Sequence, residues 1–308
     1  MNVSAPRILV TGATGLLGRP VLRACADIPG ARATGAAFRR SGPGLERIDL
    51  SQTGQLPAWL DRLAPDILIH AAAERRPDVS EKDPDGTRRL NVGTTATLAQ
   101  WAAARGAFLI YISTDYVFDG TRPPYRPGDA TRPLNAYGQS KLDGERAVQA
   151  AACDAVVLRV PILYGQVETL DESPVTVLAK NMLNAPPGEH LAMEHWATRY
   201  PTHTRDVAAV LRQLVLHKLD HPGFAGVFHW SGNEPMTKYE MARACAPFAG
   251  FDPDRLVPDA TPPAGAPRPK DSHLDSSDLE RLGIGQRTPF TAALPAIFSS
   301  LKTVPGRA

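Results

Sequence analysis

The amino-acid sequence predicts an α/β fold with a doubly wound parallel sheet. Apolar runs suited to strands alternate with segments of helical periodicity in the first half of the chain, an order that places helices on both faces of a parallel sheet. The runs 66–73 and 108–112 lack the polar alternation of a half-exposed strand, which fits central strands buried on both sides. A glycine-rich turn follows the first apolar run directly.

The expected elements follow one another in a regular order. We predict strands at 7–13, 31–38, 46–50, 66–73, 107–115 and 154–164, and helices at 15–27, 55–64, 84–105 and 136–151. Beyond residue 165, short helices are expected near 175–183, 237–249 and 277–282, between proline-rich stretches. Segments 204–217 and 226–231 are regular enough to return to the sheet.

Composition excludes several classes of protein. A chain of 308 residues with 43% hydrophobic residues can bury a large core, and its net charge of +2 gives no footprint for a nucleic acid or a membrane surface. Cys25, Cys153 and Cys245 are odd in number and far apart, so we expect reduced core thiols. No cluster has metal-ligand spacing. Without a signal segment or an apolar run of ~18 residues, a cytoplasmic protein is expected.

Three glycines mark a candidate dinucleotide site. Gly12 permits a tight turn, Gly15 lets the backbone approach a pyrophosphate, and Gly18 lets a helix pack close to the strand. We expect Thr14, Leu16 and Leu17 of the same turn to line the site. A packing turn without a ligand is the alternative interpretation.

The second predicted strand indicates which dinucleotide binds. It ends in Phe38-Arg39-Arg40 and carries no carboxylate to accept from a ribose 2′-hydroxyl. Guanidinium groups match a phosphate and stack on adenine, which favours NADP(H) over NAD(H); two solvated surface arginines are the alternative. Further candidate walls of the cofactor site are Asp49, Leu50, Ala71, Ala72, Ala73, Asn91 and Pro161.

These motifs predict that the chain is divided into a cofactor-binding domain and a substrate lobe. Residues 1–165 would form an NADP-binding Rossmann domain, to which 199–231 partly returns. Residues 166–198 and 232–308 would form a smaller, discontinuous substrate lobe.

Tyr137 and Lys141 form the candidate catalytic pair. They are four residues apart and therefore neighbours on a helix, where the ammonium should lower the phenol pKa from its usual value of about 10. A hydroxyl from Ser113 or Thr114, with Thr114 preferred, would hydrogen-bond a carbonyl oxygen. Together with a hydride, Thr114, Tyr137 and Lys141 suffice for carbonyl reduction; a solvent-facing Tyr–Lys pair is the alternative. His70 is expected to be a hydrogen-bonded core residue.

Longer strings carry a family resemblance. The chain resembles the dTDP-4-dehydrorhamnose reductase family of extended short-chain dehydrogenases in Ser113-Thr-Asp-Tyr-Val-Phe-Asp-Gly120, Pro124-Tyr125, Pro133 and Tyr137-Gly-Gln-Ser-Lys-Leu-Asp-Gly-Glu145. This resemblance implies a reductase of a 4-keto nucleotide sugar or another carbonyl substrate, with a pocket bordered by 201–206. It also implies a homodimer face on the helices at 84–105 and 136–151. Tyr116 stands where related dehydratases have a glutamate, so dehydration is disfavoured.

A second set of strings is similar to the regulatory beta subunits of methionine adenosyltransferase, members of the same family. These strings lie at 72–78, 161–165, 228–233, 236–241 and 282–290. They imply the alternative to the reductase, an NADP-binding partner of a catalytic subunit in S-adenosylmethionine synthesis, with little or no catalysis. Such subunits are implied to dock through an aromatic, basic tail. Segment 301–308 adds no aromatic residue after Phe298, which argues against that docking mode.

Overall fold

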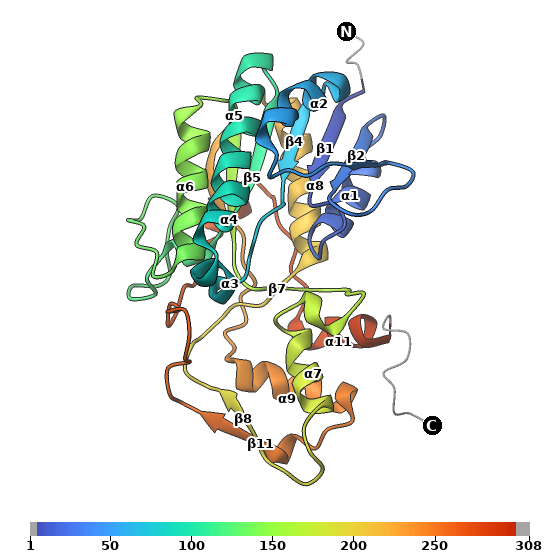
Figure 1. Ribbon diagram of the computed structural model, residues 1–308. Helices are drawn as coiled ribbons and strands as arrows, with labels where there is room; N and C mark the ends of the chain where they lie inside the picture. Colours follow the sequence, from blue (N-terminus) through green and yellow to red (C-terminus); the bar gives the residue numbers. More distant parts are fainter. Residues whose placement is uncertain (1–4, 300–308) are drawn as a thin grey trace.

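The computed structural model describes residues 5–299, and its centre is a parallel sheet of seven strands (Figure 1). The strand order is β10–β6–β5–β4–β1–β2–β3, and every pairing is parallel. The strands are β1 (Arg7–Thr11), β2 (Arg32–Ala37), β3 (Leu45–Arg47), β4 (Ile67–His70), β5 (Phe108–Thr114), β6 (Ala155–Val160) and β10 (Gly226–His229). The predicted doubly wound α/β fold is confirmed.

Helices cover both faces of this sheet. One face carries α1 (Gly18–Ala26) and α8 (Thr204–Asp220), and the other carries α2 (Leu56–Leu63), α5 (Thr94–Arg105) and α6 (Ala136–Ala150). Within β1, Ile8 and Val10 belong to the first core, whereas Leu9 belongs to the second. Because alternate side chains are buried on opposite faces, the strand reads as a continuous apolar run.

Two local features differ from the predicted elements. The helix expected at 84–105 is divided into α4 (Pro84–Arg88), a π-helical turn η2 (Arg89–Gly93) and α5. A further short helix, α3 (Pro77–Lys82), precedes it where no element was predicted. Its six residues begin at a proline and are mostly charged or polar, so they show no apolar periodicity.

A second lobe lies below the sheet in Figure 1. Its strands form two parallel pairs, β7 (Leu163–Tyr164) with β9 (Thr202–His203) and β8 (Leu191–Glu194) with β11 (Leu256–Asp259). Its helices are α7 (Thr176–Leu183), α9 (Lys238–Ala249) and α11 (Phe290–Ser299). Leu178, Met241 and Phe290 contribute to its own apolar core. In contrast, Leu279 of α10 (Ser277–Arg281) packs into the core of the sheet.

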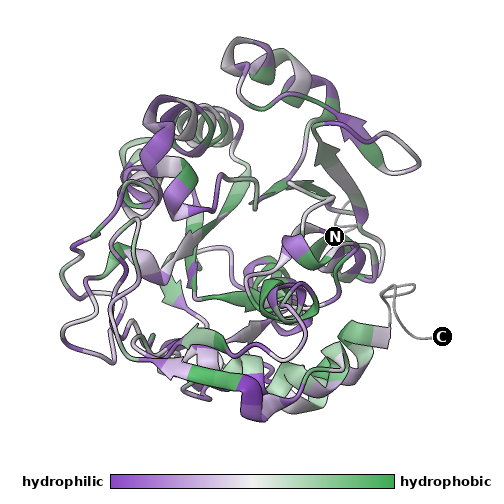
Figure 2. Cartoon of the chain, turned by 60° about the horizontal axis from the view of Figure 1, so that its bottom comes forward, coloured by the Kyte–Doolittle hydropathy of each residue, from purple (hydrophilic) through white to green (hydrophobic). Residues whose placement is uncertain are grey.

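The single helical turns are η1 (Thr53–Gln55), η3 (Asp115–Val117), η4 (Leu170–Glu172) and η5 (Pro253–Arg255). In Figure 2, α11 is coloured largely as an apolar helix, in line with its buried side chains. Between residues 5 and 299, no helix is both long and apolar enough to cross a membrane. The cysteines are unbridged, as expected. The tail at 301–308 lies outside the described residues.

Candidate functional site

The glycine-rich turn joins β1 to α1, and its shape depends on the missing side chains. Gly12 has φ of +66°, and a Cβ there would lie 2.9 Å from the backbone of Ala72. A Cβ on Gly18 would lie 2.0 Å from the carbonyl oxygen of Gly12. Gly15 closes the turn, because its N–H donates to the Gly12 carbonyl at 2.9 Å. No side chain caps the N-terminus of α1, so its first amides can receive a phosphate.

Phe38, Arg39 and Arg40 follow β2, where the sequence predicts the choice between the two nicotinamide dinucleotides. Phe38 is 58% exposed, and the Arg39 guanidinium lies 5.7 Å from the centroid of its ring. Among residues 5–299, Arg39 has no ion pair. Arg40 is different from the free guanidinium that the sequence suggested, because both of its terminal nitrogens donate to Glu168. Hydrogen bonds from Arg40 lower the pKa of Glu168.

Asp49 and Leu50, two predicted walls, have structural partners. The Asp49 carboxylate accepts from the Ser51 backbone at 3.0 Å and from the Ser51 hydroxyl at 2.7 Å. Leu50 is buried, and its carbonyl accepts from the Thr94 hydroxyl at 2.7 Å. These contacts join the segment after β3 to the start of α5.

The loop after β4 carries Ala71, Ala72 and Ala73, and it passes directly beside the glycine-rich turn. Asn91 holds this loop from the π-helical turn: its Oδ1 accepts from the Glu74 N–H at 2.8 Å, and its Nδ2 donates to the Glu74 carbonyl at 2.9 Å. The same Nδ2 donates to the hydroxyl of Ser140 at 2.9 Å. Both N–H groups of the Asn91 amide are therefore used in positioning the loop against α6.

Helix α6 carries the candidate catalytic pair beside the end of β5. The helix begins where Asn135 accepts from the Gly138 N–H at 2.8 Å, so Tyr137 lies in the first turn and Lys141 one turn later. The Tyr111 hydroxyl donates to the Lys141 carbonyl at 3.3 Å. Thr114 ends β5, and its side chain lies close enough to Tyr137 to act on the pKa of the phenol. The structure thus brings Thr114, Tyr137 and Lys141 together.

The electrostatics of the pair contradict one prediction. Burial raises the pKa of Tyr137 above its usual value, although the Thr114 side chain opposes the shift. Burial also lowers the pKa of Lys141 to about 7, against the charge of Glu145, and its Nζ lies 4.0 Å from the centroid of the Tyr111 ring. The expected lowering of the phenol pKa by the ammonium is therefore wrong: desolvation is the largest effect on Tyr137, and Lys141 is not among the groups that shift its pKa.

A buried ion pair behind α6 was missed by sequence reasoning. Arg159 donates from Nε and Nη2 to the carboxylate of Glu145 at 2.9 and 2.7 Å, and the two side chains are only 5% and 2% exposed. The Ser113 hydroxyl donates to the same carboxylate at 2.5 Å. The Ser113 hydroxyl is thus engaged by Glu145, whereas the Thr114 hydroxyl accepts from the Tyr116 N–H at 3.2 Å.

Asp115 places a second acidic group next to the site. Its carboxylate accepts from the Ser272 hydroxyl at 2.5 Å and from the Thr114 hydroxyl at 3.0 Å. Burial raises the pKa of Asp115 to about 6. The ring of the following Tyr116 meets Tyr137 edge-on, with centroids 5.9 Å apart. The sequence analysis assigned no role in the site to Asp115 and used Tyr116 only in the family resemblance and against dehydration.

His70 lies at the end of β4, where it is a core residue as expected. Its ring nitrogens lie 2.7 Å from the Thr11 hydroxyl and 3.1 Å from the Thr95 hydroxyl. Burial, followed by the charge of Lys141, lowers the pKa of His70 to about 3. Pro161, the last predicted wall, is buried directly after β6.

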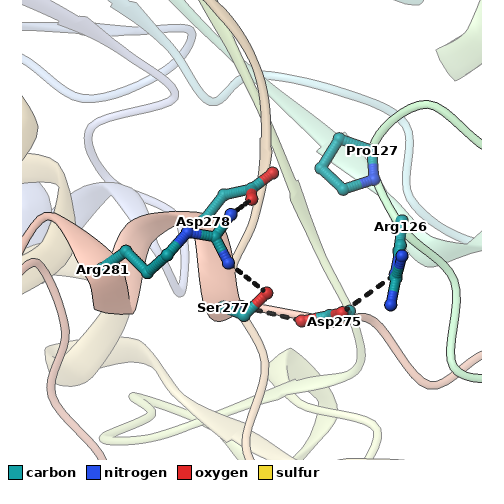
Figure 3. A pocket seen from close by; sticks show the side chains of 6 residues that line it. All are labelled: Arg126, Pro127, Asp275, Ser277, Asp278 and Arg281. Atoms are coloured by element: carbon teal, nitrogen blue, oxygen red, sulfur yellow. Dashed lines mark hydrogen bonds and ion pairs between the residues drawn. The ribbon is translucent and has the colours of Figure 1, made fainter.

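A separate polar hollow contains none of the predicted site residues. It has a volume of about 190 Å³, and Figure 3 shows Arg126 directed toward Asp275 and Arg281 toward Asp278. Its charged groups are thus paired with one another. Within residues 5–299, no three His, Cys, Asp or Glu side chains are placed to hold a metal ion.

Comparison with known proteins gives consistent matches over nearly the whole chain. Residues 6–303 match the family model described as the RmlD substrate binding domain. The chain is 50% identical over 291 residues to methionine adenosyltransferase 2 subunit beta of Rattus norvegicus, covering 94% of this chain and 86% of that protein. It is 31% identical over 290 residues to dTDP-4-dehydrorhamnose reductase of Mycolicibacterium smegmatis, covering 92% and 82% respectively.

The same family is found among solved structures. The crystal structure of dTDP-4-dehydrorhamnose reductase from Bacillus anthracis in complex with NADP has a TM-score of 0.75 and 25% identity, covering 97% of this chain and 99% of that one. The chain belongs to the RmlD substrate-binding family of extended short-chain dehydrogenases/reductases.

Proposed function

We propose that this chain binds NADP(H) and acts as a regulatory subunit of the methionine adenosyltransferase beta type, in association with a catalytic subunit. The observation that carries this proposal is the 50% identity to the rat beta subunit over 94% of the chain. The reductase of M. smegmatis aligns over nearly the same length at 31% identity. The higher identity to the beta subunit therefore does not result from a shorter alignment. The alternative given by the sequence is therefore preferred to the reductase.

The described residues fit a nicotinamide dinucleotide. The glycine-rich turn packs closely against Ala72 and on itself, which leaves the uncapped N-terminal amides of α1 for a pyrophosphate, and Phe38 offers an exposed ring beside Arg39. Lys141 is buried without a carboxylate partner in the described part of the chain, so its Nζ is available to ribose hydroxyls. When bound, the nicotinamide ring would donate a hydride in its reduced form or accept one in its oxidised form.

The raised pKa of the Tyr137 phenol argues against an efficient role in proton transfer. A general acid works best with a pKa near the working pH, whereas burial raises the pKa of Tyr137 above its usual value of about 10. Without a bound cofactor, the buried Tyr137 is therefore a weaker acid than a free tyrosine. In a regulatory subunit, Tyr137 and Lys141 would instead hold the cofactor.

A reductase is the second candidate, since the three groups that carbonyl reduction needs lie together. Thr114 lies beside Tyr137, and the buried amine of Lys141 follows one helical turn later. With a carbonyl substrate in place, the Thr114 hydroxyl would turn from Asp115 to donate to the carbonyl oxygen, and Tyr137 would supply the proton. A 4-keto nucleotide sugar is the substrate class to test.

One set of measurements separates the two candidates. The purified chain is mixed with the methionine adenosyltransferase catalytic subunit of its own organism, with and without NADPH, and complex formation is followed by analytical ultracentrifugation. Oxidation of NADPH by dTDP-4-dehydrorhamnose is followed by absorbance, with Tyr137→Phe as the control. A complex without oxidation supports the regulatory subunit. Oxidation that Tyr137→Phe abolishes, without a complex, overturns it in favour of the reductase.

A further inference from the structure

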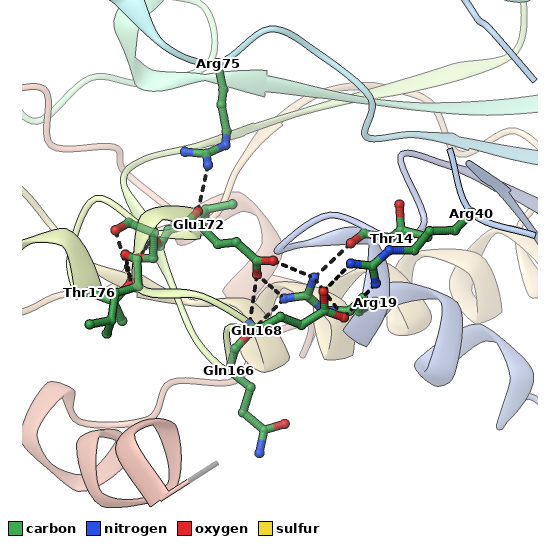
Figure 4. A network of polar contacts seen from close by, with 11 residues as sticks. Thr14, Arg19, Arg40, Arg75, Gln166, Glu168, Glu172 and Thr176 are labelled. Carbon is green, nitrogen blue, oxygen red and sulfur yellow. Dashed lines mark hydrogen bonds and ion pairs between the residues drawn. The ribbon is translucent and has the colours of Figure 1, made fainter. Parts of the chain in front are cut away.

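Five charged side chains connect the glycine-rich turn with the segment that follows β7 (Figure 4). Arg19 and Arg40 come from the sheet lobe, whereas Glu168 and Glu172 come from the second lobe. Arg75 joins them from the loop after β4, where its Nη2 donates to the Glu172 carbonyl at 2.7 Å. We call these five residues the arginine–carboxylate network. The network includes Arg40, which follows β2 and is predicted to contact the 2′-phosphate of NADP(H).

Arg19 is the fixed member of the network. Its Nη1 donates to the Thr14 carbonyl at 2.8 Å, and its Nη2 donates to the Gln166 carbonyl at 3.2 Å. The same Nη2 donates to Glu172 at 2.5 Å, and the side chain is 15% exposed. Two carbonyls and the Glu172 carboxylate accept from Arg19, and a Glu168 oxygen lies 3.9 Å from its Nη1, so Arg19 has little capacity for another anion.

Arg40 is the exchangeable member. Its only hydrogen-bond acceptor in the described part of the chain is Glu168, which it meets with two parallel N–H donors. The side chains of Arg40 and Glu168 are 54% and 42% exposed. An exposed ion pair of this kind contributes little stability, so a stronger ligand for the guanidinium can replace the carboxylate at low cost.

We propose that Glu168 is a specificity-determining residue, because its carboxylate occupies on Arg40 the place of the adenosine 2′-phosphate and competes with NADP(H). The inference rests on the proposed binding of NADP(H). It adds a residue from the second lobe to the choice of cofactor. That choice is otherwise made by the segment after β2 in this type of fold.

The competition acts on only one of the two cofactors. A 2′-phosphate and a carboxylate both bind a guanidinium through two parallel N–H···O bonds. They cannot both occupy the same pair of N–H donors of Arg40, so binding of one excludes the other. The 2′-hydroxyl of NAD(H) has no charge with which to displace Glu168. Arg39, which is unpaired among residues 5–299, can contact the phosphate without any exchange. The preference for NADP(H) is therefore smaller than two free arginines would give.

The test measures the affinities for NADPH and NADH by isothermal titration calorimetry in wild type and Glu168→Gln. Removal of the competing charge should strengthen NADPH binding by about two- to fivefold, the range expected for one exposed ion pair, and leave NADH binding unchanged. Asp171→Asn is the matched control. It removes a carboxylate from the same segment, but one that pairs with Lys180, and it should change neither affinity.

A double variant shows whether Glu168 acts through Arg40. In the Arg40→Ala background, Glu168→Gln should give no gain in NADPH affinity, since the shared guanidinium is gone. NADPH binding that is unchanged or weakened by Glu168→Gln overturns the inference, as does an equal gain in the Arg40→Ala background. If the wild-type chain binds neither cofactor, the proposed function fails, and the inference fails with it. Wild-type binding with no effect of Glu168→Gln overturns the inference alone.

Discussion

The buried ion pair between Glu145 and Arg159 gives the sharpest test of what stabilises the site. In Glu145→Gln, the amide keeps the shape of the side chain and one acceptor oxygen, but the Arg159 guanidinium loses its counter-charge at 5% exposure. Breaking a buried pair from one side costs about 3–5 kcal/mol. We expect the lower end, about 3 kcal/mol, because the Ser113 hydroxyl still has an acceptor.

Urea unfolding followed by circular dichroism measures this loss. With a slope of about 3 kcal/mol per molar urea, the midpoint should fall by about 1 M. Glu46→Gln is the control, because it also removes a carboxylate from an arginine, but from the exposed pair with Arg62, and its midpoint should stay near that of the wild type. If Glu145→Gln lowers the midpoint no more than Glu46→Gln does, the reasoning from burial is refuted.

Three further predictions follow from the described contacts. Arg39→Ala combined with Arg40→Ala should weaken NADPH far more than NADH in calorimetric titrations; equal losses would contradict a 2′-phosphate site. Gly144→Ala should lower the melting temperature although alanine favours helices, because its Cβ would lie 2.1 Å from the buried Tyr111 hydroxyl; a higher melting temperature would contradict this. Burial lowers the pKa of His229 to about 3 in the folded chain. Between about pH 6.5 and pH 3, the unfolded chain therefore binds one more proton than the folded chain at this residue. The free energy of unfolding consequently decreases as the pH is lowered, by about 1.4 kcal/mol per pH unit. His229→Gln should reduce that slope in urea titrations at about pH 4–6, and an identical slope would refute the assignment.

The fold was predictable where its signal is local. The run through Ile8, Leu9 and Val10 reads as a buried strand because both faces of the sheet are covered, and each core takes alternate side chains. The π-helical turn at Arg89–Gly93 was not predictable, since one extra residue in a turn barely changes apolar periodicity. Helix α11 was not predicted either; Pro295 lies inside it, and proline ordinarily argues against a helix interior.

In the candidate site too, only contacts between residues close in sequence could be predicted. Tyr137 and Lys141 are four residues apart, so their shared helical face follows from sequence spacing. Glu145 and Arg159 are 14 residues apart, and Arg40 and Glu168 are 128 residues apart. Only the folded chain brings these charges together, and no local pattern distinguishes them from solvated surface residues. The reversed direction of the Tyr137 pKa has the same origin, because burial is a property of the whole fold.

Strand β10 and helix α8 complete the sheet although both follow segments of the second lobe in the chain. Strand β10 pairs with the outer side of β6, and α8 packs beside α1. A fragment that stopped near residue 165 would therefore present the bare edge of β6 to other chains and leave an apolar helix face in water, two conditions that promote aggregation. The cofactor half cannot be produced by truncation. A protease cut in the second lobe should leave two pieces that stay associated through the sheet.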